Sequence, residues 1–152
     1  MPDDAQPFKK KDSLKTGDMS LIEADETENL DEVEAFLNNN GISNIPLHDS
    51  AALKRLCKIV STRAARLGAA AISAVITWMD PVLDHKHTVA IDGSLFEKYP
   101  GFGSKIEDMF KKLYGEKAGK IALVHSRDGS GKGAAIMAAV VASSAKDRKS
   151  VV

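Results

Sequence analysis

The chain has little of several residue types, and each scarcity excludes a class of protein. A single cysteine, Cys57, excludes an intramolecular disulfide framework and favours a reducing compartment, so we expect a cytoplasmic protein. Aromatic residues make up 5% of the chain and its basic residues are scattered, which argues against a nucleic-acid-binding surface. The N-terminus has no apolar run typical of a secretory signal, and no stretch approaches the ~20 apolar residues of a membrane span.

The composition that remains is typical of one soluble globular domain. The 152 residues are 43% hydrophobic and 28% charged, which is enough chain for a single core. The net charge of zero hides an asymmetry. Residues 1–50 carry twelve Asp or Glu against four Lys, a balance of −8, and the rest of the chain carries +8. We interpret the basic charges of the second part as a solvated surface.

Apolar periodicity predicts two helices in the first half of the chain. A short helix is expected in "NLDEVEAFLNNNGI", with Asn29 as its N-cap and Gly41 as its stop. A long helix is expected to follow a cap at Asp49 or Ser50 and to end before Pro81, which cannot continue it. Its apolar face consists of Leu53, Leu56, Cys57, Val60, Ala64, Leu67, Ala71, Ala74, Val75 and Trp78, with Cys57 assigned to the core.

The second half alternates between strand and helix. "HTVAIDGS" and "KIALVHS" are typical of short buried strands, a helix is expected after Pro100, and a last helix in "GKGAAIMAAVVASSA". This alternation favours an α/β fold with parallel strands covered by helices. Two strands make a small sheet, so we expect part of a larger α/β layer. In the last helix the expected core stripe is Ile136, Val140 and Val141.

Two glycine-rich turns follow the predicted strands. The Gly-Ser-Gly-Lys ending at Lys132 suggests a P-loop, but Ser126 stands where that motif has its first glycine, and Gly133 where it has a hydroxyl. The P-loop is therefore excluded. The turns at 92–94 and 128–133 lie at the carboxyl ends of strands, the edge where open α/β sheets bind ligands. Their residues alone leave open both a nucleotide site and two ordinary tight turns.

Four segments, taken in order, resemble the C-terminal part of eukaryotic hexokinases and glucokinases. They are "LKTGDMSLIEAD", "LKRLCKIVSTRAARLGAAAISAVI", "VAIDGSLFEKYPGF" and "DGSGKGAAIMAA". The resemblance extends from about Leu14 to Ala145. It implies a portion of the large lobe of an actin-like, ribonuclease-H-like ATPase domain, with helices packed on a small, largely parallel sheet. We divide the chain into a polar arm (1–28), the hexokinase-like segment (29–146) and a tail (147–152).

The resemblance also implies a function and a set of contacts. The complete protein would phosphorylate a hexose such as glucose, with ATP and Mg, and this chain would supply the adenosine side of the nucleotide site. Lys132 falls at a position where the family accepts several residue types. The implied nucleotide contacts are Thr16, Ser20, Gly93, Ser94, Ser130 and Gly131.

The family's other catalytic elements have no counterpart in the sequence. The general base for the sugar hydroxyl, the phosphate loops, the sugar-holding carboxylates and the Mg ligands are not found, so no catalytic or metal residue is assigned. Asp92 and Asp128 are expected to cap turns. The four histidines lack a compact ligand spacing.

These absences leave alternatives for the role and the partners of the chain. The alternative to an enzyme segment is a non-catalytic hexokinase-like binding or regulatory module. Besides ATP or ADP, the expected partner is the preceding part of a hexokinase or a second copy of the chain. Arg63 and Arg66 are expected to pair with acids of a neighbouring element that the sequence does not identify.

Overall fold

The computed structural model describes residues 13–126 and 128–149, with the backbone alone for Ser130 and for residues 142–149. Residues 1–12 of the predicted arm and 150–152 of the predicted tail lie outside the described residues. In chain order the elements are α1 (Thr16–Ala24), α2 (Asp31–Asn39), α3 (Leu47–Met79), β1 (His87–Ile91), α4 (Ser94–Lys98), α5 (Phe102–Tyr114), the 3₁₀ helix η2 (Gly115–Lys120), β2 (Ile121–His125) and α6 (Gly129–Lys149).

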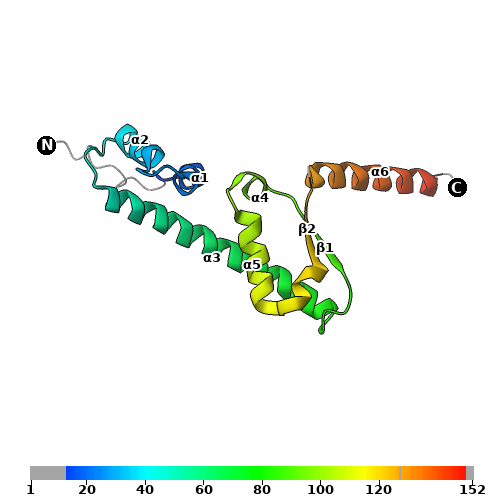
Figure 1. Cartoon of the computed structure of the whole chain (residues 1–152). Helices are drawn as coiled ribbons and strands as arrows, with labels where there is room; N and C mark the ends of the chain where they lie inside the picture. Colours follow the sequence, from blue (N-terminus) through cyan, green and yellow to red (C-terminus); the bar gives the residue numbers. More distant parts are fainter. Residues whose placement is uncertain (1–12, 127, 150–152) are drawn as a thin grey trace.

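The long helix α3 runs from the region of α1 and α2 to the region of α5 and the two strands (Figure 1). Helices α1 and α2 pack at its N-terminal end, whereas α5 crosses its C-terminal half, and α6 extends away from both. The predicted α/β arrangement is confirmed. Strands β1 and β2 pair in parallel, from His87 opposite Ile121 to Ile91 opposite His125. Because the strands are parallel, the two glycine-rich turns leave the sheet at the same edge.

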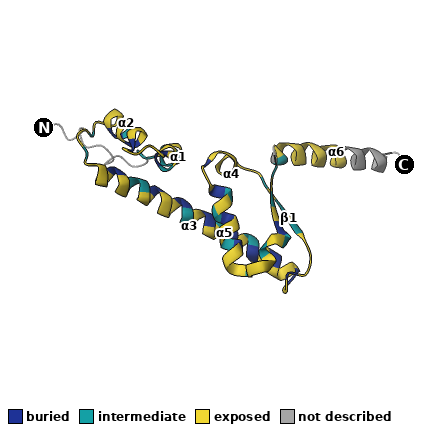
Figure 2. Cartoon of the chain, viewed as in Figure 1, coloured by how far each residue is buried: buried dark blue, intermediate teal, exposed yellow. Residues whose placement is uncertain are grey.

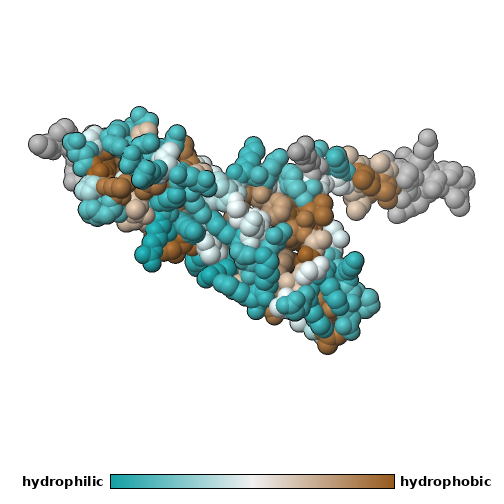
Figure 3. Space-filling view, in the orientation of Figure 1, coloured by the Kyte–Doolittle hydropathy of each residue, from teal (hydrophilic) through white to brown (hydrophobic). Residues whose placement is uncertain are grey.

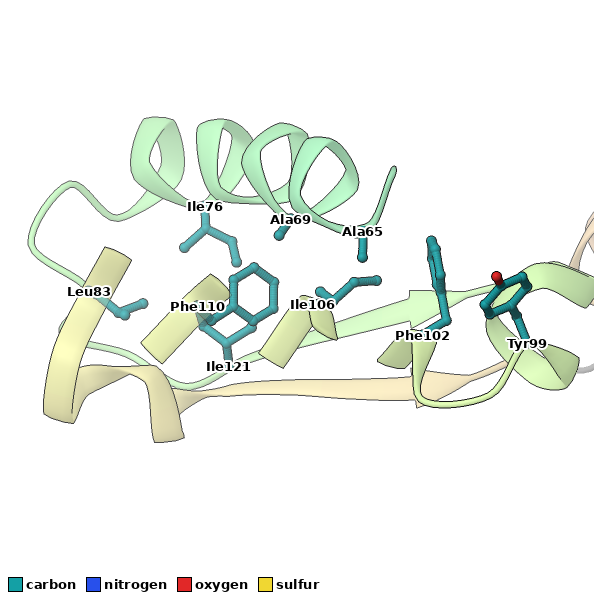
Figure 4. Packing of buried hydrophobic residues seen from close by; sticks show 9 residues of the cluster. All are labelled: Ala65, Ala69, Ile76, Leu83, Tyr99, Phe102, Ile106, Phe110 and Ile121. Atoms are coloured by element: carbon teal, nitrogen blue, oxygen red, sulfur yellow. The ribbon is translucent and has the colours of Figure 1, made fainter. Parts of the chain in front are cut away.

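Helix α3 packs through small side chains. Ala65, Ala69 and Ile76 contact the face of α5 that carries Ile106 and Phe110, as Figure 4 shows. A second cluster, at the other end of α3, surrounds Cys57, which is buried as predicted. Burial raises the pKa of the Cys57 thiol, and the negative charge of Glu23 raises it further. The members of the second cluster are Ile22, Leu30, Val33, Leu37 and Cys57.

The prediction of which face α3 buries is wrong for most of its large side chains. Leu56, Val60, Leu67 and Trp78 are exposed, and Figure 2 shows exposed residues along most of the helix. The reason is that α3 carries apolar residues on more than one face. Its small residues allow α5 to approach closely, so the face of α3 that carries the small residues packs against α5.

The last helix also departs from expectation. The predicted core stripe of Ile136, Val140 and Val141 is more than half exposed, because α6 projects from the sheet edge. Apolar patches are accordingly visible over the strands and along α6 (Figure 3). Within the described residues, the core of the molecule lies between α3 and the elements α1, α2 and α5.

Several boundaries differ from those predicted. Helix α2 begins at Asp31 rather than after Asn29, because Leu30 adopts a left-handed conformation with φ of 57°. The Asp31 backbone N–H donates to the Thr27 hydroxyl at 2.8 Å, so Thr27 supplies the cap. Helix α3 begins at Leu47, directly after Pro46, and ends before Pro81 as expected. Helix α1, inside the predicted arm, and the short α4 had not been predicted as helices.

One described helix, α3, is long and apolar enough to cross a membrane. Length and composition alone are weak grounds for such an assignment, since core helices meet the same criterion. Arg63 and Arg66 lie in its middle, where each cation would cost about 3 kcal/mol in a bilayer. Its buried face also packs on α1 and α5. We therefore treat α3 as a helix of a folded domain.

The turn between α3 and β1 is organised by Asp80. The carboxylate accepts backbone N–H groups from His85 at 2.9 Å and Asp84 at 3.0 Å, and it contacts the His87 ring nitrogen at 3.0 Å. These hydrogen bonds, first those from the two backbone N–H groups, hold the pKa of Asp80 well below its usual range. Asp80 therefore fixes the chain reversal that returns β1 alongside the core.

Asp80→Asn is expected to lower the thermal unfolding midpoint at pH 7. Because the pKa is depressed on folding, the stabilisation is complete above the ordinary value of about 3.9 and is lost as pH falls through the folded pKa. The difference between wild type and variant should therefore shrink below about pH 3. Calorimetry across this pH range measures the difference in unfolding midpoint, and the exposed Asp84→Asn variant is the control. A difference independent of pH would contradict the assignment.

Candidate functional site

A hollow of about 400 Å³ separates α1 from α4. The two helices are neighbours in Figure 1 although they are far apart in the sequence. Helix α1 contributes hydroxyl groups and a glycine, whereas α4 and the residue after it contribute a hydroxyl, apolar surface and a cation. The lining residues are Thr16, Gly17, Ser20, Ser94, Leu95, Lys98 and Tyr99. Three of the six predicted contacts, Thr16, Ser20 and Ser94, thus lie together at one hollow.

The first glycine-rich turn delivers Ser94 to this hollow. Gly93 has φ of 153° and ψ of 140°, a conformation that residues with a side chain rarely adopt. It lets the chain turn abruptly from β1 into α4, and the Gly93 carbonyl accepts the Glu97 N–H at 3.2 Å. Ser94 is the first residue of α4. Gly93 itself does not line the hollow, so its place in the site is to orient the Ser94 backbone.

The second turn lies beside the first. The Ser126 N–H donates to the Ile91 carbonyl at 2.9 Å, which holds the ends of the two strands together. A Cβ on Gly129 would lie 2.8 Å from the Ser126 Oγ and 3.5 Å from an Asp92 carboxylate oxygen. A side chain at 129 would therefore displace the Ser126 side chain at the close approach of the two turns.

Gly131 has a similar local requirement. A Cβ at this position would lie 2.4 Å from the Asp128 Oδ1, because the Asp128 carboxylate folds over the first turn of α6. Asp128 has φ of 55°, and its carbonyl accepts the Lys132 N–H at 3.0 Å. Asp128 thus serves the turn, as predicted. The Ser130 side chain, one of the six predicted contacts, lies outside the described side chains.

A buried polar cluster fixes α1 against α3 and α5. The Glu23 carboxylate accepts hydrogen bonds from the Ser61 hydroxyl at 2.6 Å and the Tyr99 hydroxyl at 2.8 Å. The Lys105 ammonium donates to Glu23 at 2.5 Å and to Ser61 at 2.7 Å. The Glu23 and Lys105 side chains are 8% and 15% exposed. We call these four residues the Glu23 cluster.

The ionisation of the Glu23 cluster follows from its contacts. Burial tends to raise the pKa of Glu23, but hydrogen bonds from Lys105, Ser61 and Tyr99 outweigh it and leave the pKa lowered. Burial and the neighbouring Glu23 carboxylate raise the pKa of the Tyr99 phenol. Glu23 is therefore charged and Tyr99 neutral at physiological pH. Since Tyr99 also lines the hollow, the cluster sets the distance between its two walls.

Sequence reasoning missed all of the Glu23 cluster and four residues of the hollow, Gly17, Leu95, Lys98 and Tyr99. A signal for the cluster existed. Lys105 follows Phe102 by three residues and precedes Met109 by four, which places a cation on an apolar helix face. A cation there needs a buried acidic partner. The sequence alone does not identify that partner, because Glu23 lies 82 positions away.

The arrangement suits an organic ligand with polar groups better than a metal ion. Leu95 and Tyr99 offer apolar surface, and the hydroxyls of Thr16, Ser20 and Ser94 offer hydrogen bonds. Within residues 13–126 and 128–149, no three His, Cys, Asp or Glu side chains are grouped so that they could hold a metal. A second, larger hollow of about 570 Å³ lies on α3 and is lined by cations, but it contains no strand-end turn.

Comparison with known proteins gives a consistent result. The hexokinase family model matches residues 2–140. Hexokinase-1 of Schizosaccharomyces pombe is 32% identical over 131 residues, covering 86% of this chain and 26% of that protein. Hexokinase-2 of Saccharomyces cerevisiae is 31% identical, covering 97% and 31%. Hexokinase-1 of Arabidopsis thaliana is 43% identical over 90 residues, covering 55% and 18%. The chain thus spans less than a third of these relatives.

Structural comparison supports the same assignment. A crystal structure of hexokinase superposes with a TM-score of 0.69 at 22% identity, covering 84% of this chain and 30% of that one. At this identity the superposition establishes the fold. It confirms the predicted portion of an actin-like ATPase domain, in which helices surround a small parallel sheet. With a family match over nearly its whole length, the chain belongs to the hexokinase family.

Proposed function

We propose that this chain supplies the adenosine side of the nucleotide site of a cytoplasmic, ATP-dependent hexose kinase. The observation that carries the proposal is the hollow between α1 and α4. Its hydroxyls come from Thr16 and Ser20 on one wall and from Ser94 on the other. The resemblance had assigned these same residues to the nucleotide from their sequence positions alone.

The donor set of the hollow fits an adenosine group. The volume of about 400 Å³ lies within the usual range for small-ligand sites of roughly 300–1,000 Å³. Leu95 and Tyr99 would pack against the base, and the hydroxyls would hydrogen-bond to its polar edge and to the ribose. The first turn of α6 presents backbone N–H groups beside the Asp92 turn, and such helix ends favour phosphate. ATP, when bound, supplies the phosphoryl group for transfer.

The described residues do not fit the catalytic part of the reaction. Glu23 is engaged by Lys105, Ser61 and Tyr99 inside the fold, so it is unsuited to accept a proton from a sugar. Asp128 folds over the turn that opens α6. The base, the Mg ligands and the sugar contacts are therefore assigned to the part of a hexokinase that this chain does not match. The same observation favours the second candidate, a hexokinase-like module that binds nucleotide without turnover.

The chain alone is expected to bind ADP weakly, with a dissociation constant of about 1 mM, because only one side of the site is present. Ser94→Ala should weaken binding about three- to tenfold, the usual effect of losing one hydrogen bond. Equilibrium dialysis measures both values. Ser104→Ala, which removes an exposed hydroxyl from α5, is the matched control and should leave the affinity unchanged.

The second turn supplies a further comparison in the same experiment. Gly131→Val should abolish measurable binding, since its side chain displaces the Asp128 carboxylate and obstructs the α6 amides. Lys132→Ala should change the affinity less than twofold. If Lys132→Ala is as damaging as Gly131→Val, the lysine binds phosphate and our assignment of the turn is wrong. An effect of Ser104→Ala equal to that of Ser94→Ala would contradict the hollow as the site.

A further inference from the structure

Neither the backbone nor the packing of α1 requires glycine at position 17. Within the described residues, the glycines with positive φ are Gly41, Gly93, Gly101 and Gly115, so Gly17 has a conformation open to any residue. A Cβ added at Gly17 would meet no atom within 4 Å. Glycine is also one of the weakest helix formers. The missing side chain at position 17 therefore needs an explanation outside the fold of α1.

Gly17 lies in the wall of the hollow between α1 and α4. Helix α1 lines the hollow with Thr16, Gly17 and Ser20, and positions i, i+1 and i+4 lie on one side of a helix. Because glycine has no side chain, the surface that Gly17 contributes is backbone. Leu95 and Tyr99 supply apolar surface to the same hollow. A flat ring that enters the hollow can thus lie between the α1 backbone and apolar side chains.

The two walls of the hollow are held at a fixed separation. The Tyr99 hydroxyl donates to the Glu23 carboxylate at 2.8 Å and lies 3.4 Å from the Met19 carbonyl oxygen, and both acceptors belong to α1. Tyr99 is buried, so losing these contacts would leave polar groups unpaired inside the fold. The hollow therefore cannot widen to accommodate a side chain at position 17 without breaking them.

We propose that Gly17 determines which nucleobase the hollow admits. With no side chain at position 17, a bicyclic purine lies flat against the α1 backbone, whereas a side chain there leaves room only for the smaller ring of a pyrimidine. The hydroxyls of Thr16, Ser20 and Ser94 can hydrogen-bond to either kind of nucleoside, so they do not discriminate by size. The inference rests on the proposed function for the class of ligand, and it adds the residue that selects the base.

The test compares ADP with CDP, which share the ribose diphosphate and an amino group on the base but differ in ring size. Dissociation constants come from amide chemical-shift titrations of the full chain, which measure millimolar binding. We expect the wild-type chain to bind ADP about fivefold more tightly than CDP. Gly17→Leu should weaken ADP binding about tenfold and CDP binding less than about threefold, so that the preference disappears. Gly17→Ala should weaken ADP binding by an intermediate factor.

Gly68→Leu is the matched control, and it should leave both affinities unchanged. Gly68 is also a helical glycine at which a Cβ would meet no atom within 4 Å, but it lies in α3 and does not line the hollow. Gly17→Ala guards against unfolding as the cause, because alanine favours the helix and should maintain or raise the thermal unfolding midpoint. Loss of the fold would weaken ADP and CDP binding alike.

The possible outcomes separate this inference from the proposed function. Equal affinity of the wild-type chain for ADP and CDP would overturn the inference, as would a preference for ADP that survives Gly17→Leu. Equal weakening of ADP and CDP binding by Gly17→Ala would also overturn it. In each of these cases ADP still binds at the hollow, so the proposed function stands. If ADP shifts no amide of the hollow, the proposed function and the inference both fail.

Discussion

Replacing Glu23 with alanine is expected to lower the free energy of unfolding by about 3–5 kcal/mol, because Lys105 then keeps a buried charge without a carboxylate. The Lys105 side chain is only 15% exposed and lies over the Tyr99 ring at 5.2 Å, so it cannot reach water without disturbing the core. The Tyr99 hydroxyl loses its nearer acceptor in the same variant and keeps only the Met19 carbonyl at 3.4 Å. Urea denaturation followed by circular dichroism measures the change.

Two further variants separate the charge from the packing. Glu26→Ala, an exposed acid just beyond α1, should cost less than 0.5 kcal/mol, as is usual for surface changes. The double variant Glu23→Leu with Lys105→Met should be more stable than Glu23→Ala, since neither charge is left unpaired. A loss below about 1 kcal/mol for Glu23→Ala would show that the cluster does not hold α1 in place.

The isolated chain is expected to show no phosphorylation of glucose above background in a coupled assay. Phosphoryl transfer depends on positioning and charge stabilisation around the transferred group, and an alcohol nucleophile also requires a base. The described chain offers the hollow that we propose for adenosine but engages its buried carboxylates in structural contacts. Adding the unmatched part of a hexokinase should restore turnover.

The same assay discriminates between the alternatives for this chain. Turnover by the chain alone that Asp92→Asn or Asp128→Asn abolishes would overturn our assignment of both aspartates to turns. A stable complex that binds ADP without turnover would instead favour the non-catalytic module.

The strands and the long helices were predictable because their signals are local. Short apolar runs with β-branched residues identified β1 and β2, and Pro81 marked the end of α3. Because the two strands were predicted to be parallel, the two turns that follow them were expected at the same edge of the sheet. The short helix α4 could not be predicted, because five residues carry too little apolar periodicity and its start depends on the conformation of Gly93.

The packing of α3 could not be predicted in the same way. Periodicity selects large apolar residues, such as Leu67 and Trp78, whereas the buried contact with α5 uses Ala65 and Ala69. A helix with apolar residues on more than one face leaves its orientation undetermined by the pattern. The hollow was predictable only in part, because its two walls are joined by the hydrogen bond from Tyr99, directly after α4, to Glu23 of α1, two residues that are distant in sequence.

The most direct test of the nucleotide site is an ADP titration of the ¹⁵N-labelled chain followed by amide chemical shifts. We predict saturable shifts at 16–20, 93–95 and 129–131, the three backbone segments that surround the hollow and the neighbouring turn, with the same dissociation constant at each. Shifts confined to Arg55, Lys58, Arg63 and Arg66 would instead place the phosphates in the larger, cation-lined hollow on α3 and would contradict the account.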